Sequence, residues 1–331
     1  MGRPSTILVL THPFDPTADY VVAELNQRGV PVFRCDPGEF PRRLTLTARL
    51  DAAGWQGRLR LPERCVDLAD IGCVYYRRPT LFDLPDDLSG EVRRWASQEA
   101  RMGLGGVLAT LPNWLNHPKD IAAAEYKPAQ LAVATEVGLH VPPTLITNDP
   151  DAARAFAEQS GPVVYQSLTP ASVADGDTHR LVFAAPVSPE WIDASVGLTA
   201  HLFQRSLADE SHEVRLTAVD DTLLATRIDA HSQAARTDWR ADYDHLGYTA
   251  LADADIPAPV RSGITALLNR FRLRFGVFDF VVTPDETWWF LEINPNGQWA
   301  WIQGATGQPI AAAIADALQR GGPGQERASP S

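Results

Sequence analysis

Residues 276–298 read Gly-Val-Phe-Asp-Phe-Val-Val, then Thr-Pro-Asp-Glu-Thr, then Trp-Trp-Phe-Leu-Glu-Ile-Asn-Pro-Asn-Gly-Gln. The outer segments are rich in β-branched and aromatic residues, which favour strands. The segment between them holds Pro and Asp, which are typical of turns. We therefore predict a β-hairpin, with a turn that we centre between Asp285 and Glu286.

This register places two carboxylates opposite each other. Asp279 faces Glu292, and Asn294 lies on the same face of the hairpin. Two carboxylates about 5 Å apart in apolar surroundings repel, so they need a shared cation, a shared proton or open solvent. Carboxylate and amide oxygens suit Mg²⁺, which makes these three residues candidate metal ligands. A solvated polar face on an antiparallel strand explains the hairpin pattern equally well.

The composition is that of an ordinary globular protein, and it disfavours some classes of partner. The chain has 331 residues, of which 45% are hydrophobic and 21% charged. This length favours two or three packed lobes over a single core. A net charge of −12 argues against a nucleic acid or an anionic membrane as the main partner. An acidic substrate would need a local basic patch.

The cysteines and the hydropathy pattern favour a reducing cytoplasm. Cys35, Cys65 and Cys73 lack the spacing of zinc ligands, and their odd number does not suit a disulfide framework. No apolar run approaches membrane-spanning length, and the run Ile7–Leu10 is too short for a secretory signal. We therefore expect no membrane partner.

The N-terminal segment predicts a strand, a helix and a second strand. Thr6–Leu10 is apolar, residues 19–28 carry helical spacing, and residues 30–34 are apolar again. The loop after the first strand lacks the glycines of a dinucleotide-binding fingerprint. His12 and Asp15 in this loop could contact a ligand, although a capping and turn role is the stronger interpretation.

A run of tyrosines and arginines, Tyr75-Tyr76-Arg77-Arg78-Pro79, ends another predicted strand. Adjacent side chains of a strand point to opposite faces, so at most one arginine serves a shared site unless the strand has ended. A following helix adds three more arginines, and the five could form a basic rim for an acidic peptide. Solvated helix charges explain this pattern equally well. The five arginines are Arg77, Arg78, Arg93, Arg94 and Arg101.

Two further features are cationic. Lys127-Pro128 opens a predicted helix, where backbone amides add to the lysine charge and favour a phosphate. Residues 213–229 predict a second hairpin. If Thr222 lies in its turn, Arg215 faces Arg227, whereas a two-residue turn puts the two arginines on opposite faces. Arginines that face each other need an anion between them.

The order and spacing of these motifs resemble the ATP-grasp ligases, and most closely their peptide-modifying branch, the graspetide or microviridin-type synthetases. The resemblance covers nearly the whole chain. It implies a mixed α/β and α+β architecture, with a pre-ATP-grasp α/β lobe followed by two α+β lobes that clasp ATP. The matching segments are Tyr75–Pro79, the helix start at Lys127, Leu145–Pro150, Glu213–Arg215, Asp238–Arg240 and Asp279–Trp299.

The resemblance implies ATP and Mg²⁺ as cofactors and gives individual residues a role. Lys127 would contact the nucleotide phosphates, and Gln204 would lie near the adenine. Arg215, together with Arg227, would meet the triphosphate. Arg240 would lie beside the transferred phosphoryl group, so Arg215 and Arg240 are the expected catalytic residues. The Mg²⁺ ligands would be Asp279, Glu292 and Asn294.

One residue departs from the pattern that the resemblance implies. ATP-grasp enzymes usually carry a second phosphate-binding lysine where this chain has Gln166. A glutamine can hydrogen-bond a phosphate oxygen but brings no charge, so Arg215, Arg227 or Mg²⁺ would have to supply the missing attraction. Gln166 remains an expected nucleotide contact.

We expect three lobes and a tail. The central lobe would hold the leader segment of a peptide substrate between about Leu168 and Thr199, and the C-terminal lobe would hold ATP and Mg²⁺. The tail lacks the apolar content to fold. The expected ranges are 1–112, 113–200, 201–320 and, for the disordered tail, 321–331.

The function that the resemblance implies is peptide macrocyclisation. The enzyme would activate Asp or Glu side chains of a ribosomally made precursor peptide as acyl phosphates and join them to Thr or Ser hydroxyls or to Lys amines. Tyr76, Arg77 and Arg78 are our candidates for contacting its acidic, Thr-rich core, and a homodimer is the expected assembly. An intermolecular carboxylate–amine ligase is one alternative. A non-catalytic binding protein is another, motivated by Gln166.

Overall fold

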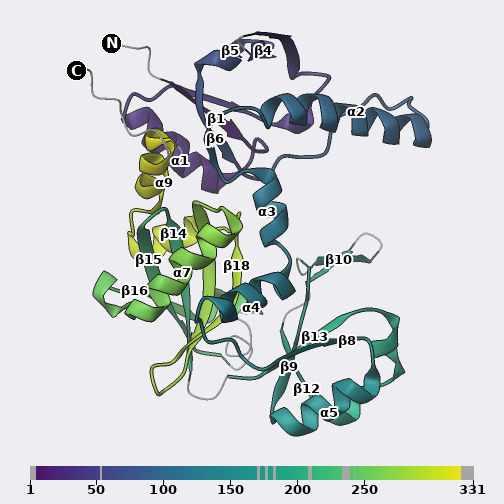
Figure 1. Cartoon of the computed structure of the whole chain (residues 1–331), viewed down its shortest axis with the longest axis vertical. Helices are drawn as coiled ribbons and strands as arrows, with labels where there is room; N and C mark the ends of the chain where they lie inside the picture. The colour runs from purple at the N-terminus through teal and green to yellow at the C-terminus, as the bar shows by residue number, and fades with distance from the viewer. Residues whose placement is uncertain are drawn as a thin grey trace. The chain divides into compact units, whose positions relative to one another are not determined.

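The computed structural model describes residues 5–52, 54–169, 172–175, 178–181, 184–207, 211–232, 239–241 and 243–321. The chain forms two compact units. Unit 1 runs to Ile121 and takes in Leu273–Phe275 and the segment from Asn296 onward. Unit 2 comprises Ala122–Arg272 and Gly276–Pro295. Figure 1 shows the elements of both units coloured along the chain.

Unit 1 contains a parallel sheet with the strand order β2-β1-β6-β7. The strand–helix–strand opening predicted from the sequence is confirmed. The central strand β1 is buried along nearly its whole length, as its continuous apolar run requires. The elements are β1 (Thr6–Leu10), α1 (Pro16–Gln27), β2 (Val32–Cys35), β6 (Ile71–Tyr76) and β7 (Trp114–Leu115).

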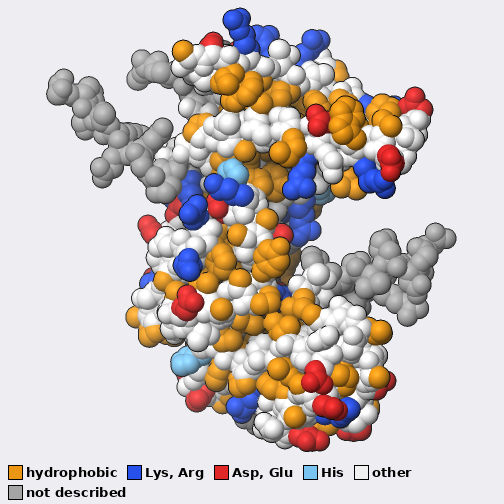
Figure 2. Space-filling model, turned by 45° about the vertical axis from the view of Figure 1, so that its right-hand side comes forward, with side chains coloured by type: hydrophobic (Ala, Val, Ile, Leu, Met, Phe, Trp, Pro, Cys, Tyr) orange, Lys and Arg blue, Asp and Glu red, His pale blue; other side chains and the backbone are white. Residues whose placement is uncertain are grey.

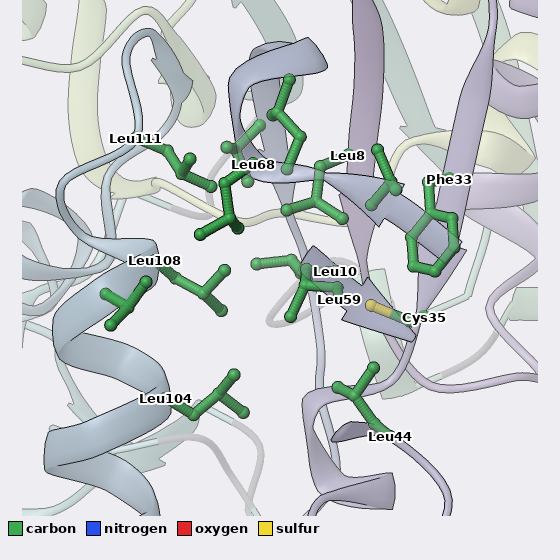
Figure 3. Close-up of a cluster of buried hydrophobic side chains, with 14 of the residues drawn as sticks. Leu8, Leu10, Phe33, Cys35, Leu44, Leu59, Leu68, Leu104, Leu108 and Leu111 are labelled. Carbon is green, nitrogen blue, oxygen red and sulfur yellow. The ribbon is translucent and has the colours of Figure 1, made fainter. Parts of the chain in front are cut away.

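A three-stranded antiparallel sheet and a long helix contribute to the core of unit 1. Leu104 and Leu108 of the helix join Leu10 and Leu59 in one buried cluster, which is drawn in Figure 3. Removing these side chains from water is the main favourable contribution to folding here. The elements are β3 (Thr45–Asp51), β4 (Gly54–Leu61), β5 (Arg64–Asp67) and α2 (Gly90–Leu108).

The C-terminal helices α8 (Ala300–Thr306) and α9 (Ile310–Arg320) belong to unit 1. α9 buries an apolar stripe and packs beside α1. The expected C-terminal lobe, residues 201–320, also includes these helices, and its bounds stay a prediction. Apart from Gly321, the expected disordered tail lies outside the described residues.

Unit 2 contains a small sheet with the order β12-β9-β13-β8, and α5 packs on it through a buried apolar cluster. A two-stranded antiparallel hairpin, β10 with β11, precedes β12. The elements are β8 (Thr144–Thr147), α5 (Pro150–Ser160), β9 (Val163–Gln166), β10 (Ser172–Asp175), β11 (Thr178–Leu181), β12 (Ala185–Val187) and β13 (His201–Arg205).

Unit 2 also contains a larger sheet with the order β16-β15-β14-β17-β18. Helix α4 packs against β18 and against α7. The elements are α4 (Lys127–Glu136), β14 (His212–Val219), β15 (Thr222–Ala230), β16 (Leu246–Ala250), α7 (Ala258–Phe271), β17 (Phe275–Val282) and β18 (Trp288–Asn294).

Short helices complete the described residues. None of the helices in this part of the chain combines the length and apolar character that crossing a membrane requires. The remaining helix is α3 (Pro118–Ala124), and the 3₁₀ helices are Pro37–Glu39, Leu68–Asp70, Pro189–Trp191, Ala194–Leu198, Trp239–Ala241, Tyr243–His245 and Asp253–Asp255.

Candidate active site

The predicted hairpin is formed by β17 and β18, and its two carboxylates face each other. Asp279 pairs with Glu292, as the sequence predicted. Asn294 lies two residues further along β18 and reaches both carboxylates. The structure therefore brings all three candidate metal ligands together on one face of unit 2.

The register between the carboxylates and the turn is shifted by one residue. Phe280 pairs with Phe290, and the turn is centred on Asp285. The predicted turn centre, between Asp285 and Glu286, is therefore wrong by half a residue. Leu291 is the extra residue of a β-bulge, and this bulge restores the carboxylate pairing that the sequence predicted.

Three cationic side chains meet the two carboxylates. Nη1 of Arg215, on β14, donates to Asp279 Oδ1 at 2.6 Å. Nζ of Lys127, the first residue of α4, lies 2.8 Å from Glu292 Oε2. Nη1 of Arg240 lies 3.8 Å from Glu292 Oε1. The structure thus assembles the predicted lysine and both predicted catalytic arginines around one carboxylate pair.

The carboxylate pair is shielded from solvent. The side chain of Asp279 is 9% exposed and that of Glu292 is 13% exposed. Asn294 Nδ2 donates to Glu292 Oε1 at 3.3 Å and lies 3.5 Å from Asp279 Oδ2. The alternative interpretation of the sequence, a solvated polar strand face, is therefore wrong at these positions.

The two carboxylates differ in their affinity for a proton. Burial would raise the pKa of Glu292, but the charges of Lys127 and Arg240 outweigh it and lower this pKa to about 2. Burial raises the pKa of Asp279 despite the charge of Arg215, and the neighbouring Glu292 charge adds to the rise. At Asp279, therefore, the neighbouring cations do not offset the cost of burial, which favours a further cation beside this carboxylate.

The oxygen donors at this position fit Mg²⁺. Two carboxylates supply hard, anionic oxygens, and Asn294 can present its amide oxygen by rotating its side chain. Across the described ranges, no group of three or more His, Cys, Asp or Glu side chains could hold a metal ion. Mg²⁺ usually combines one or two carboxylates with waters and phosphate oxygens, so two carboxylates suit an ion shared with a phosphorylated ligand.

A pocket opens between the two sheets of unit 2. Gln166 Nε2 donates to Gln204 Oε1 at 3.0 Å, and Gln204 Nε2 donates to Thr144 Oγ1 at 2.9 Å. Both glutamines that were expected to contact a nucleotide therefore line one pocket. Its walls include Val164, Gln166, Gln204, Ile228, Trp239 and Leu291.

Solved structures of peptide-modifying ligases are similar to nearly the whole chain. An ATP-grasp ligase associated with RiPPs from Chryseobacterium gregarium, solved with ADP and a leader and core peptide, is 28% identical with a TM-score of 0.87, covering 96% of this chain and 98% of that one. The macrocyclase MdnC from Microcystis aeruginosa MRC, bound with precursor peptide MdnA, is 27% identical with a TM-score of 0.81, covering 95% and 99%. MdnB from the same organism is 28% identical with a TM-score of 0.75, covering 95% and 99%.

A family model and the site geometry agree with these matches. The model of the MvdD pre-ATP grasp domain matches residues 6–122. The chain therefore has the ATP-grasp fold and resembles ATP-grasp ligases that act on precursor peptides. It is therefore an ATP-dependent, ADP-forming enzyme, and the predicted ATP-grasp fold is confirmed. No curated protein gave a significant match to the ligase.

Arg227 lies away from the carboxylate pair of the ligase. Val219 pairs with Thr222, so the turn has two residues and Arg215 pairs with Thr226. Arg227 therefore points to the opposite face of the sheet from Arg215. The structure does not bring it to the predicted triphosphate site, because strand alternation leaves only Arg215 on the carboxylate side.

Arg77 is a buried residue of unit 1, which corrects its expected contact with a peptide. β6 ends at Tyr76, and the Arg77 side chain that follows has no exposed surface. Its Nε lies 3.3 Å from Asp15 Oδ2, and both Nη atoms donate to acceptors in residues 296–298 at 3.1–3.2 Å. The guanidinium is thus occupied inside unit 1 and is not part of a basic rim.

Tyr76 and the other arginines of the expected rim are at least partly accessible. Arg78 is exposed and Tyr76 is half-buried, so their contact with a peptide stays a prediction. Arg94 pairs with Glu91 on the surface of α2. Figure 2 shows acidic side chains among the basic ones on the visible surface, which agrees with solvated charges on this helix.

Asp15 has the capping role that was the stronger interpretation of the sequence. Its Oδ1 accepts from the backbone amides of Thr17 and Ala18 at the start of α1, and its Oδ2 accepts from Thr11 Oγ1 at 2.8 Å. His12 Nδ1 accepts from the Phe14 amide, as in a turn. Both residues shape the loop of unit 1 after β1.

Gln130 is a residue of the site that the sequence analysis missed. It is 2% exposed. Its Oε1 accepts from the Ile293 amide and its Nε2 donates to the Ile293 carbonyl, both at 3.0 Å. These bonds fix α4 to the strand residue between Glu292 and Asn294. A polar side chain one helical turn after Lys127 was the signal available in the sequence.

Trp239 is a second missed residue. The resemblance included the Asp-Trp-Arg motif but gave a role only to Arg240. The indole is 5% exposed and lies beside both site arginines. An aromatic residue next to a catalytic cation was the signal that could have singled it out.

Proposed function

We propose that this ligase closes rings in a ribosomally made precursor peptide by joining Asp or Glu side chains to Thr or Ser hydroxyls or Lys amines. The observation that carries the proposal is the paired Asp279 and Glu292, shielded from solvent and surrounded by Lys127, Arg215 and Arg240. The solved ligases with peptides bound support a peptide as the substrate.

The site suits the activation of a carboxylate by ATP. The attacking carboxylate and the γ-phosphate are both anionic, so their approach needs positive charge that is already in place. When bound, Mg²⁺ held by Asp279, Glu292 and Asn294 would neutralise phosphate charge. Arg215 and Arg240 lie beside these carboxylates and supply the remaining positive charge.

Lys127 is placed to respond to the nucleotide. Its ammonium contacts Glu292 and also donates to the Ser167 carbonyl at 2.9 Å. A phosphate oxygen at the start of α4 would attract this flexible point charge, and the helix N-terminal amides add to the attraction. Gln166 contributes a neutral hydrogen bond from the pocket wall in place of a second lysine.

The proposed reaction has two steps that balance. A side-chain carboxylate oxygen of the peptide attacks the γ-phosphorus, the bond to the β-phosphate oxygen breaks, and ADP leaves. A hydroxyl or amine of the same peptide then attacks the acyl carbon, loses its proton, and expels phosphate. The peptide loses one water for each bond formed, and the enzyme itself need not form a covalent intermediate.

The peptide would be held at two places. We propose that its leader segment lies along the central part of unit 2, between about Leu168 and Thr199, and that Arg78 and Tyr76 contact the acidic core. A homodimer in a reducing cytoplasm is the proposed setting. The leader position rests on the resemblance to peptide-modifying ligases, the core contacts on the exposed arginine, the homodimer on the usual assembly of soluble proteins, and the cytoplasm on the cysteine pattern.

The test is incubation of the purified ligase with ATP, Mg²⁺ and the candidate precursor peptide, followed by mass spectrometry. Ring closure predicts the loss of one water per bond and release of one ADP. A gain in mass on an acceptor would instead select an intermolecular ligase. Binding of the peptide without any peptide-dependent ADP release would contradict catalysis and select a binding protein.

A further inference from the structure

The indole of Trp239 lies next to the two arginines of the candidate active site. The Cζ atom of Arg215 is 5.4 Å from the ring centroid, and that of Arg240 is 6.0 Å away. Both distances are within the range of a cation–π contact. Because Trp239 is 5% exposed and the Arg215 side chain is 7% exposed, the contact between these two is largely shielded from water, which strengthens it.

The two arginines serve different carboxylates. Arg215 contacts Asp279 at 2.6 Å, whereas Arg240 lies at the longer distance of 3.8 Å from Glu292. The Arg215 side chain is 7% exposed and that of Arg240 is 44% exposed. Arg240 is therefore held less tightly by its carboxylate.

Two guanidinium groups that share one small site repel each other. A neutral polar side chain beside the two arginines could accept hydrogen bonds from them in only a few directions. The face of an indole attracts a cation over a broad area and adds no negative charge that would compete with the carboxylates and phosphates. Trp239 can thus steady both arginines without competing for the nucleotide.

We propose that Trp239 is a positioning residue, which aims Arg215 and Arg240 at the phosphates through cation–π contacts. The inference rests on the proposed function, in which these arginines meet the triphosphate. Trp239 also lines the pocket between the two sheets, so it could instead serve only as part of the pocket wall. A residue of the pocket wall would affect binding of the nucleoside as well as the phosphates. A residue that positions the arginines would affect binding of the phosphates alone.

The experiment measures nucleotide binding by calorimetry in the full-length protein. The variants are Trp239→Phe, Trp239→Leu and a series in which fluorinated tryptophans replace Trp239 site-specifically. Fluorine withdraws charge from the ring face while nearly keeping its shape. The probes are AMP and the non-hydrolysable ATP analogue adenylyl imidodiphosphate, each with Mg²⁺, so the two ligands differ in their phosphates and share the nucleoside.

The expected result is a selective loss of affinity for the triphosphate. Trp239→Leu should weaken its binding by about 2- to 30-fold, the range of a cation–π contact, and change AMP binding by less than about 2-fold. Trp239→Phe should recover part of the loss, and each added fluorine should weaken triphosphate binding further. Equal losses for AMP and the triphosphate, or a flat fluorine series, would overturn the proposal.

Two features keep the test decisive. If Trp239→Leu fails to fold, as judged by its thermal transition, the fluorine series still decides, because it leaves packing nearly unchanged. Trp95→Leu, at an exposed tryptophan of α2, is the matched control and should bind both nucleotides normally. The binding experiment contains no peptide, so its result for Trp239 does not depend on whether the ligase cyclises a peptide. If the unmodified protein does not bind the triphosphate, the proposed function itself is contradicted.

Discussion

Unit 1 and unit 2 each bury an arginine–aspartate pair, and the two aspartates respond in opposite directions. Burial would raise the pKa of Asp15, but the charge of Arg77 and several hydrogen bonds outweigh it, so this pKa is lowered. Burial raises the pKa of Asp279, even though its contact with Arg215 is shorter, 2.6 Å against 3.3 Å.

The difference lies in what else surrounds each carboxylate. Asp15 accepts from a threonine hydroxyl and two amides at the start of α1, so its oxygens are well supplied with donors. Asp279 has a second carboxylate, Glu292, as its neighbour across the hairpin. A close arginine is therefore not enough to identify a structural ion pair. A buried carboxylate whose charge stays undercompensated is the better candidate for binding a cation.

The largest expected effect is on stability in unit 1. Arg77→Met removes the cationic partner of the buried Asp15 and three hydrogen bonds to residues 296–298. We expect the free energy of unfolding to fall by about 3–5 kcal/mol. Urea unfolding, followed by far-ultraviolet circular dichroism, measures the change.

The matched control is Arg94→Met on α2, where the arginine and its partner Glu91 are largely exposed. Its unfolding midpoint should stay where it is in the unmodified protein, because exposed ion pairs contribute little. If Arg77→Met unfolds at the same urea concentration as this control, the Asp15 pair is not structural and the comparison fails.

The next effect is on catalysis in unit 2. Asp279→Asn keeps the size of the side chain but removes a charge that would hold Mg²⁺. We expect the rate of ATP-dependent cyclisation to fall by about 100- to 1000-fold, as when a preorganised electrostatic contact is lost. Urea unfolding of this variant accompanies the rate measurement, because Arg215, which is 7% exposed, keeps an amide oxygen as acceptor but loses its charged partner.

Asp285→Asn, in the turn of the same hairpin, is the control for this substitution. Its carboxylate lies in the exposed turn and accepts from Thr283 and Thr287, away from the carboxylate pair. Its rate should match the unmodified enzyme. Full activity of Asp279→Asn would rule out the metal-ligand assignment, whatever the control shows.

The pairing within the hairpin could be predicted because it depends on local pattern. Alternation and a short polar break placed Asp279 opposite Glu292, and the bulge at Leu291 compensated the error in the turn. Lys127 was recognisable because Pro128 marks the start of a helix. Such features involve neighbours in sequence or one strand pairing.

The positions that could not be predicted depend on distant residues or on one turn. The acceptors of Arg77 lie 62 and about 220 residues away, so nothing near it in the sequence indicates burial. The face of Arg227 depended on whether the turn has two or three residues. Asp220 has φ of 48°, a conformation that two-residue hairpin turns require and that Asp tolerates better than most residues.

The acid dependence of stability is a smaller effect that sharpens the comparison. The pKa of Asp15 is lowered from its ordinary value of 3.8 in the folded state. The stability that its charge provides is therefore fully present above the unfolded pKa and is lost as the pH falls through the folded pKa. The difference in unfolding free energy between the unmodified protein and Asp15→Asn should be constant above about pH 5 and shrink below about pH 4.

Urea titrations of both proteins at each pH measure this difference. Asn remains a good helix cap, so the variant isolates the charge from the capping geometry. A difference that stays constant down to about pH 3 would mean that folding does not shift the pKa of Asp15, and the comparison with Asp279 would fail.

The smallest effect concerns Arg227, which lies on the face of β15 opposite to the one carrying the carboxylates. Its Nε contacts Asp229 Oδ1 at 2.6 Å, and the two side chains are 44% and 29% exposed, so this pair contributes about 0–1 kcal/mol at most. Arg227→Met should change affinity for Mg²⁺ and adenylyl imidodiphosphate by less than about 2-fold, whereas Arg215→Met should weaken it by about 10- to 100-fold through loss of a charged hydrogen bond. Calorimetric titration of the two variants side by side tests this ranking.

Equal losses of nucleotide affinity in the two variants would mean that both arginines reach the phosphates. A sheet with a two-residue turn between β14 and β15 does not allow this.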